Sequence, residues 1–123
     1  MAREVFSEDH MRIIQEYVPG CQVTLAHIIA SPDKILYEKL GLDPRIDYAK
    51  AAIGVTTVTP SETAIIMADI AMKASGITLG FVDRFSGSLI FTGTVSEVQA
   101  GMEALLAYVR DNLGYTVCNI TKT

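Results

Sequence analysis

The order of predicted elements between Ala51 and Ile120 constrains the fold more than any other feature of the sequence. Apolar β-rich runs and helical patterns follow one another there as strand, helix, strand, strand, helix, strand, the last strand spanning residues 115–120. This order is the split βαβ arrangement of ferredoxin-like folds, an antiparallel sheet with two helices on one face. We therefore predict an α+β protein with a ferredoxin-like core.

A β-hairpin is predicted at the centre of this core. Two apolar β-rich runs, residues 77–79 and 89–93, are joined by a short segment that ends in glycine. Its tip carries Asp83, Arg84 and Phe85, where a lone domain usually has Asn, Gly or Ser. Loop tips on a rigid scaffold often carry function. The tip is therefore a candidate site, and a surface turn with a weak local salt bridge is the equally open alternative.

Capping signals predict where the two core helices begin. Thr59 and Glu62 form a capping-box pattern before a helix that extends to about Ser75, and Ser96 and Gln99 repeat the pattern before the second helix. The second helix has an apolar stripe at helical spacing. Its members are Val98, Met102, Leu105, Leu106, Val109 and Leu113.

An additional strand–helix unit precedes the core. Residues 22–30 have strand composition, and Ser31 is the predicted N-cap of a short helix over residues 33–40. Before this unit, residues 12–18 also have strand composition and end at a Pro-Gly pair. This N-terminal β-strand has no evident sheet partner, and unpaired strand edges seek one.

Composition narrows the classes of function. Half of the 123 residues are apolar, a balance that favours buried subunit contacts. The net charge of −4 argues against nucleic-acid binding, and the apolar runs are too short for a membrane span. The two cysteines are far apart, which favours free thiols in a reducing cytosol, and no secretion signal is evident.

Side chains that usually carry catalysis are sparse. His10 and His27 stand alone, and a lone strand histidine is more often structural than catalytic. Asp69 is expected to make hydrogen bonds at a packing face, and Met67 and Met72 are expected in the core. Phosphate-binding glycine loops and zinc-type ligand pairs are not found. We therefore expect no enzyme activity, no cofactor and no metal.

Four long collinear motifs are found at residues 15–20, 22–27, 59–64 and 80–87. Together they resemble the circularly permuted bacterial microcompartment (BMC) shell proteins of the EutS/PduU type. The resemblance implies a structural homohexamer that tiles edge to edge with other shell proteins. Such shells form a cytoplasmic organelle around enzymes that produce an aldehyde, as in ethanolamine, propanediol or choline breakdown, and these enzymes are possible cargo partners. In non-permuted relatives the strand–helix unit lies at the C-terminus.

The resemblance also implies a pore site at the hairpin tip. Asp83, Arg84, Phe85, Ser86 and Gly87 align with the loop that surrounds the central pore in non-permuted relatives, where it is closer to Lys-Ile-Gly-Ser-Gly. Ser86 and Gly87 match this pattern, and the first three residues depart from it. Six arginines near one axis need acids or bound anions, and Asp83 is the nearest candidate.

Two further sites follow from the resemblance. Lys73 matches the lysine at the tile edge, and a role as a helix-dipole partner is the alternative. Residues 1–20 would form a tail with a strand that joins five others in a β-barrel over the pore, leaving 21–123 as the permuted BMC domain. The barrel would plug the channel. Its residues are Arg12, Ile13, Ile14, Gln15, Glu16, Tyr17 and Val18.

Three other functions remain as alternatives to the shell tile. A ferredoxin-like module could bind a small molecule at a subunit interface, or the barrel could hold a cargo peptide. A small hydrolase or isomerase is disfavoured by the missing acid–base pair. An RNA-binding sheet is disfavoured by the net charge and by the few aromatic residues in the strands.

Overall fold

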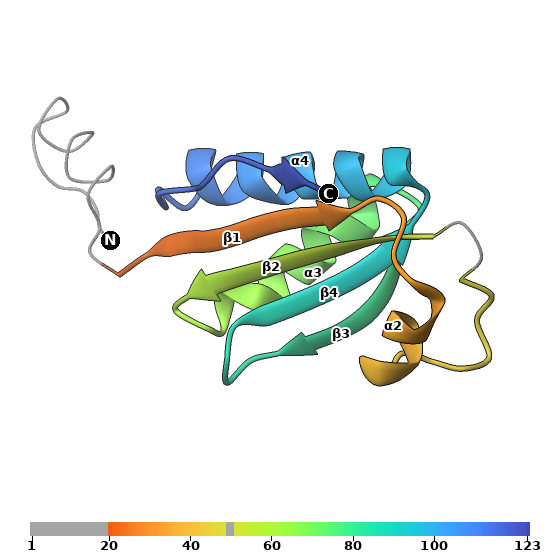
Figure 1. Cartoon of the computed structure of the whole chain (residues 1–123). Coiled ribbons are helices and arrows are strands. Elements are labelled where there is room, and N and C mark those ends of the chain that lie inside the picture. Colours follow the sequence, from red (N-terminus) through yellow and green to blue (C-terminus); the bar gives the residue numbers. More distant parts are fainter. Residues whose placement is uncertain (1–19, 49–50) are drawn as a thin grey trace, which may run out of the picture.

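The computed structural model describes residues 20–48 and 51–123, which form one sheet with helices on both faces (Figure 1). The predicted N-terminal strand over residues 12–18 lies outside the described residues. Among the helices of the described part, none is long and apolar enough to cross a membrane. The strands are β1 (Gln22–Ile29), β2 (Ala52–Thr59), β3 (Thr78–Asp83), β4 (Ser88–Gly93) and β5 (Thr121–Lys122), and the helices are α2 (Lys34–Lys39), α3 (Thr63–Ala74) and α4 (Val95–Asp111).

The five strands lie in the order β3-β4-β2-β1-β5. The β3–β4, β4–β2 and β2–β1 pairs are antiparallel, whereas β1 and β5 are parallel. The predicted sequence of core elements is therefore confirmed, but the sheet is not antiparallel throughout. Strand β1, from the front of the chain, lies between β2 and β5 and takes the place beside β2 that the last strand of a ferredoxin-like core would have.

The last strand is shorter and later than the sequence predicts. The expected strand over residues 115–120 is replaced by the two-residue strand β5, preceded by one isolated bridge between Thr116 and Gln22. Strand β1 is irregular between Val23 and Leu25. This irregularity lies between the two places where β1 pairs with the C-terminal segment, the Gln22–Thr116 bridge and the His27–Thr121 pair. Regular pairing between β1 and this segment therefore resumes only at β5.

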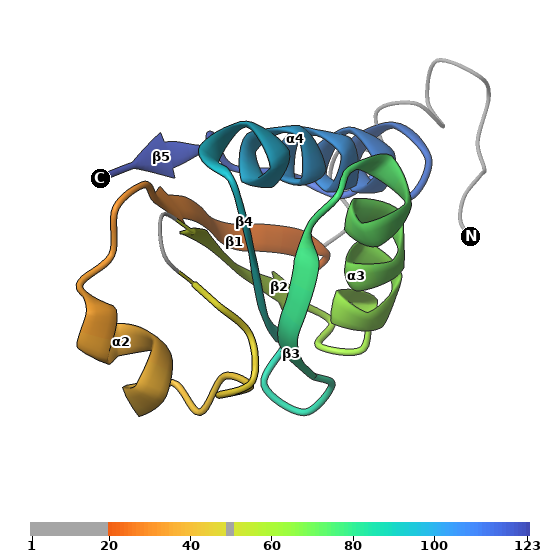
Figure 2. The same ribbon diagram turned by 90° about the vertical axis from the view of Figure 1, so that its right-hand side faces the viewer.

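The sheet separates two apolar layers. Helices α3 and α4 cover one face, and α2 lies on the other side (Figure 2). Residues such as Phe91, Met67 and Leu105 are fully buried between the sheet and the two long helices. A smaller cluster beneath α2 includes Tyr37 and Ile90. The apolar stripe predicted for the second core helix therefore faces the sheet, as its spacing indicates.

Small residues let α3 and α4 approach each other closely. The alanine-rich side of α3 is buried at Ala64, Ala68 and Ala71, although Ala74 is exposed. A Cβ atom on Gly101 of α4 would lie 3.6 Å from the Ala71 Cβ atom. This spacing is ordinary van der Waals contact, so the two helices touch through their smallest side chains.

The capping box of α4 begins two residues before the predicted one. The Thr94 side chain accepts a hydrogen bond from the Glu97 amide at 3.1 Å, and the Glu97 carboxylate accepts one from the Thr94 amide at 2.9 Å. Strand β4 remains paired with β2 up to Gly93. The helix therefore starts as soon as the sheet ends, and Ser96 already lies inside it.

The predicted caps of the other two helices are also wrong. Thr59 pairs with Gln22 in the β1–β2 ladder, so it cannot cap α3, which begins at Thr63 without a side-chain cap. Helix α2 is capped by Asp33, whose carboxylate accepts a hydrogen bond from the Ile35 amide at 3.0 Å, and not by the predicted Ser31. In both cases the path of the preceding strand decides which residue reaches the helix N-terminus.

Candidate functional site

The tip of the β3–β4 hairpin is fixed by the Asp83 carboxylate. Its oxygens accept hydrogen bonds from the Phe85 amide and the Ser86 hydroxyl, both at 2.9 Å. The hydrogen bond from the Phe85 amide, followed by that from Ser86, holds the pKa of Asp83 below its usual value of 3.8. Asp83 is therefore ionised at neutral pH and organises the loop that follows it.

Gly87 ties the tip to strand β2. Its amide donates to the Asp83 carbonyl oxygen at 2.8 Å, and its own carbonyl accepts from the Val58 amide at 3.1 Å. Its φ angle is +80°, in the left-handed region that favours glycine. The close approach to β2 and the positive φ both require glycine here.

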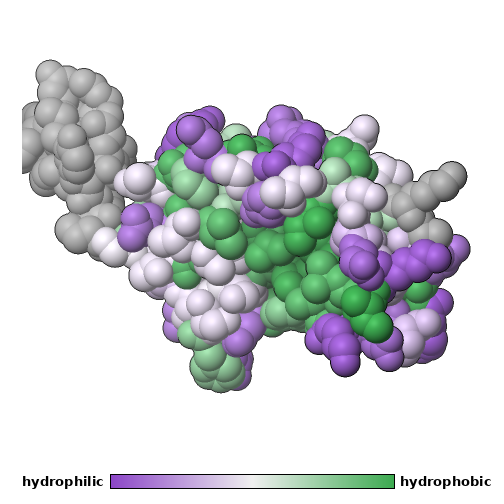
Figure 3. Space-filling model, in the orientation of Figure 1, coloured by the Kyte–Doolittle hydropathy of each residue, from purple (hydrophilic) through white to green (hydrophobic). Residues whose placement is uncertain are grey.

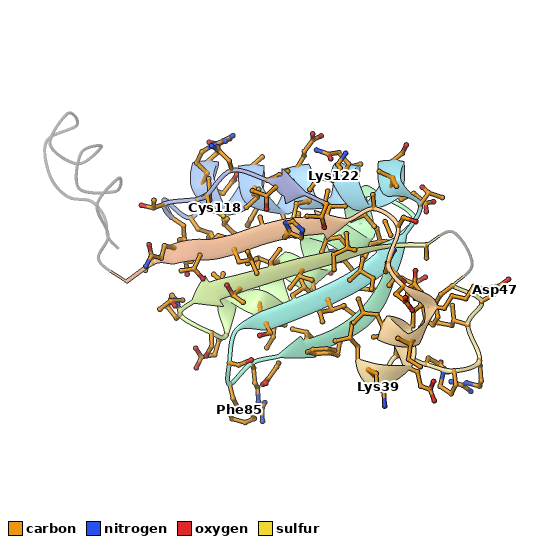
Figure 4. All side chains as sticks on the ribbon, viewed as in Figure 1. Lys39, Asp47, Phe85, Cys118 and Lys122 are labelled. Carbon is orange, nitrogen blue, oxygen red and sulfur yellow. The ribbon has the colours of Figure 1, made fainter. Side chains whose placement is uncertain are left out.

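Arg84 and Phe85 extend beyond this scaffold. The Arg84 guanidinium carbon lies 5.0 Å from the centre of the Phe85 ring, a cation–π contact. Phe85 is 81% exposed and lies at the outer end of the hairpin (Figure 4). The Asp83 carboxylate is hydrogen-bonded to Phe85 and Ser86, and its pairing with the arginines of a ring stays a prediction. Each tip nevertheless carries one positive and one negative charge.

The outer face of α3 holds the second candidate site. The Lys73 ammonium lies 2.8 Å from the Asp69 carboxylate one turn earlier, and both side chains are more than half exposed. The hydrogen bond that the Lys73 ammonium donates to the Asp69 carboxylate raises the pKa of Lys73. Asp69 therefore lies at the surface and not at a packing face, contrary to the prediction from its apolar surroundings in the sequence.

Three large apolar side chains share this exposed side of α3. Ile65, Ile66 and Met72 are 42–49% exposed, whereas Met67 is buried. The prediction that Met72 belongs to the core is wrong, because α3 turns its alanine-rich side toward α4. Single exposed apolar residues are common, but three on one short helix suit a contact with another chain.

The tip and Lys73 lie at opposite ends of α3. An added Cβ atom on Gly87 would lie 3.1 Å from the Ser61 Cα atom, just before the helix begins. Lys73 is in the last turn of the helix. The rise per residue of an α-helix separates these two ends by about 18 Å. The structure therefore keeps the two candidate sites apart.

A hollow beneath α2 was not predicted. It has a volume of about 1140 Å³ and is lined by α2 and the connector after it. The rings of Tyr37 and Tyr48 are stacked there with centres 4.7 Å apart, and the Tyr37 hydroxyl donates to the Ala51 carbonyl oxygen at 2.6 Å. Burial raises the pKa of both tyrosines. The only sequence signal was the two tyrosines themselves.

His27 has a structural role, as expected. Its two ring nitrogens form hydrogen bonds with the Thr121 hydroxyl at 2.5 Å and the Thr123 hydroxyl at 2.9 Å. The histidine thus links β1 to the C-terminal segment. Over residues 20–48 and 51–123, no group of three His, Cys, Asp or Glu side chains is arranged to hold a metal ion. Cys21 and Cys118 are both free thiols.

Comparison with known proteins identifies the family. The BMC domain profile matches residues 52–121, more than half of the chain. The chain belongs to the BMC-domain family. This BMC protein is 50% identical over 112 residues to the shell protein CutR of Streptococcus intermedius, covering 91% of this chain and 92% of CutR. It is 47% identical to PduU of Salmonella typhimurium over 91% of this chain and 93% of PduU. It is 45% identical to EutS of Escherichia coli over 94% of this chain and 99% of EutS.

Solved structures of shell proteins also match this fold. The fold matches a CutR flat hexamer subunit with a TM-score of 0.78 and 42% identity, covering 99% of this chain and all of that one. A fused permuted hexameric shell protein, MSM0275, matches with a TM-score of 0.61 and 26% identity, covering 72% of this chain and 45% of that one. These matches confirm the permuted BMC fold and a structural, non-enzymatic shell role. The BMC protein therefore belongs to the bacterial microcompartment.

Proposed function

We propose that this BMC protein forms a hexameric tile in the shell of a microcompartment that encloses aldehyde-producing enzymes. The observation that carries the proposal is the match to the subunit of a flat CutR hexamer over nearly the whole chain. The exposed apolar side chains of α3 support it, because a ring covers such surface with a second copy of the chain. Other shell proteins would meet the tile at its edges, and the enclosed enzymes would meet its inner face.

In this tile the hairpin tip lies at the sixfold axis and Lys73 lies at the outer edge. The separation of the tip and Lys73 along α3 supports this arrangement, because an axis site and an edge site must lie at opposite ends of a subunit. Residues 1–20 precede the BMC domain of residues 21–123. Six copies of the strand over residues 12–18 form a closed β-barrel over the pore, since closure removes unpaired strand edges.

The test of the tile combines mass and microscopy. Native mass measurement should give a closed ring of six chains, and a monomer would contradict the proposal. Electron microscopy of concentrated protein should then show sheets of rings. The variant Lys73→Ala should keep the rings and lose the sheets. Asp69→Ala is the matched control, because it breaks the same Lys73–Asp69 pair but retains the lysine.

Deletion of residues 1–18 tests the barrel. The shortened chain should still form rings, and image averaging should show loss of the density that covers the axis. Collapse of the rings would show that this segment holds the subunits together instead.

The hollow beneath α2 supports a second function. Its size and its tyrosine pair suit a ferredoxin-like module that binds a small molecule or a cargo peptide. If the protein forms rings that never make sheets, and Tyr48→Ala abolishes binding of a cargo enzyme, this second function gains support over tiling.

A further inference from the structure

The most exposed large apolar side chain among the described residues is at the hairpin tip. Phe85 is 81% exposed, whereas the other exposed large apolar residues range from 38% to 54%. Figure 3 shows the tip as a separate apolar projection at the lower edge of the molecule. Burial of a phenylalanine side chain is strongly stabilising, so a single chain leaves a substantial stabilising contact unused at this position.

The tip is already held in one conformation. Asp83 accepts hydrogen bonds from the Phe85 amide and the Ser86 hydroxyl, and Gly87 bonds to both Asp83 and Val58. The Ser86 hydroxyl also accepts from the Ser88 amide at 3.3 Å. A rigid loop loses little conformational entropy when it is covered, which favours association. A rigid exposed aromatic beside an arginine has the composition of an interface hot spot.

The charges of the tip allow several copies to come together. The Asp83 carboxylate and the Arg84 guanidinium cancel in net charge, so tips that converge do not repel one another as monopoles. Arg84 lies over the ring of its own Phe85, at 5.0 Å, and so supports one face of that ring. The edge and the other face of the ring remain free to contact a second ring.

We propose that six Phe85 rings meet on the sixfold axis and close it as an apolar collar, each ring braced by its own Arg84. This inference rests on the proposed function, which places the tip at that axis. A constriction lined by apolar side chains excludes hydrated ions and polar solutes because it does not hold water. Closure of the pore is then a property of the loop itself, in addition to any barrel formed by residues 12–18.

Chemical crosslinking tests the position of the tip in the full chain. In a background of Cys21→Ser and Cys118→Ser, the variant Phe85→Cys is treated with a short bismaleimide. We expect covalent links between chains of the same ring. Lys39→Cys, on α2, is the control for collisions between rings (Figure 4). Crosslinks no more frequent than in this control would overturn both the axis position and the collar.

Tryptophan fluorescence tests the collar itself. The chain contains no tryptophan, so Phe85→Trp gives a single probe. Assembly into rings should shift its emission to shorter wavelength, lower iodide quenching severalfold, and produce a circular dichroism couplet from rings in contact. Lys39→Trp should show none of these changes. If residue 85 crosslinks but the tryptophan stays accessible, the axis position stands and the collar is wrong. Protected emission without the couplet also contradicts the collar, because another segment then covers the ring.

A stability measurement covers the case in which Phe85→Trp fails to assemble. Phe85→Ala should lower the temperature at which rings dissociate and leave the unfolding of the isolated chain unchanged, since the side chain is exposed there. Unchanged ring dissociation would overturn the collar.

Discussion

Gly87 and Val58 are in direct backbone contact, and this contact joins the hairpin tip to the end of β2. The Val58 amide donates to the Gly87 carbonyl oxygen at 3.1 Å, and any Cβ atom on Gly87 would overlap the Val58 carbonyl oxygen. The orientation of Arg84 and Phe85 therefore depends on a glycine that lies two residues after Phe85 and three residues after Arg84.

Replacement of Gly87 should be costly. Gly87→Ala must adopt φ near +80° and also move away from β2, so we expect the free energy of unfolding to fall by about 2–4 kcal/mol. Chemical denaturation measures this loss. Gly41→Ala is the matched control, because Gly41 also has a positive φ of +73° but has no atom within 4 Å of the added Cβ. It should cost only about 1 kcal/mol. Equal losses for both variants would show that the contact with Val58 is not important.

The hairpin tip should loosen in acid. The hydrogen bonds from Phe85 and Ser86 keep the pKa of Asp83 in the folded chain below 3.8. A depressed pKa contributes stability that is present above the unfolded value and is lost as the pH falls through the folded value. The amide resonance of Phe85, followed by NMR, should therefore titrate with a midpoint below 3.8. Asp83→Asn should abolish the transition, and a midpoint above 3.8 would contradict these hydrogen bonds.

The buried hydroxyl of Thr56 should be destabilising. It is fully buried and has no hydrogen-bond partner among the described residues. Thr56→Val keeps the shape and removes the hydroxyl, so the free energy of unfolding should rise by about 1 kcal/mol. Thr63→Val is the opposite control, because the Thr63 hydroxyl is paired with that of Tyr115 at 2.8 Å. It should lower stability by about 1 kcal/mol. A loss of stability in Thr56→Val would indicate an ordered water at that hydroxyl.

His27 should hold the C-terminal segment on β1. His27→Ala removes both side-chain hydrogen bonds to Thr121 and Thr123, which together contribute about 1–2 kcal/mol. The Thr123 amide, which donates to Ile28 at 2.9 Å, should then exchange with solvent about tenfold faster. Amides of α4 serve as the internal reference. If they accelerate equally, the histidine stabilises the whole domain and not only its end.

Local patterns predicted the element types well and their ends poorly. The predicted hairpin and the predicted apolar stripe of α4 both agree with the structure. The capping residues were misassigned, because Thr59 and Ser96 have the right chemistry but lie inside a strand and a helix respectively. Several residues near a helix N-terminus can act as caps, and the end of the preceding strand selects among them.

For the candidate sites, the sequence likewise predicted the type of element and missed the side-chain contacts. The sequence predicted that the tip lies on a hairpin turn and that Lys73 lies near the end of a helix, and the structure agrees with both positions. The roles of these residues stay predictions. The sequence did not show that the Asp83 carboxylate accepts hydrogen bonds from Phe85 and Ser86, or that Arg84 lies over the Phe85 ring. Such choices among neighbouring polar groups depend on backbone angles that no pattern encodes.

The sequence by itself determined the family, the succession of strands and helices, and the glycine and serine that close the hairpin. These features depend on residue spacing and composition within short stretches of the chain, so a single sequence is enough to identify them. Only the tertiary structure decided that β1 lies between β2 and β5, that Met72 faces outward, and that Phe85 extends freely into solvent. Those outcomes depend on contacts between distant segments, whose packing fixes which face of each element is covered.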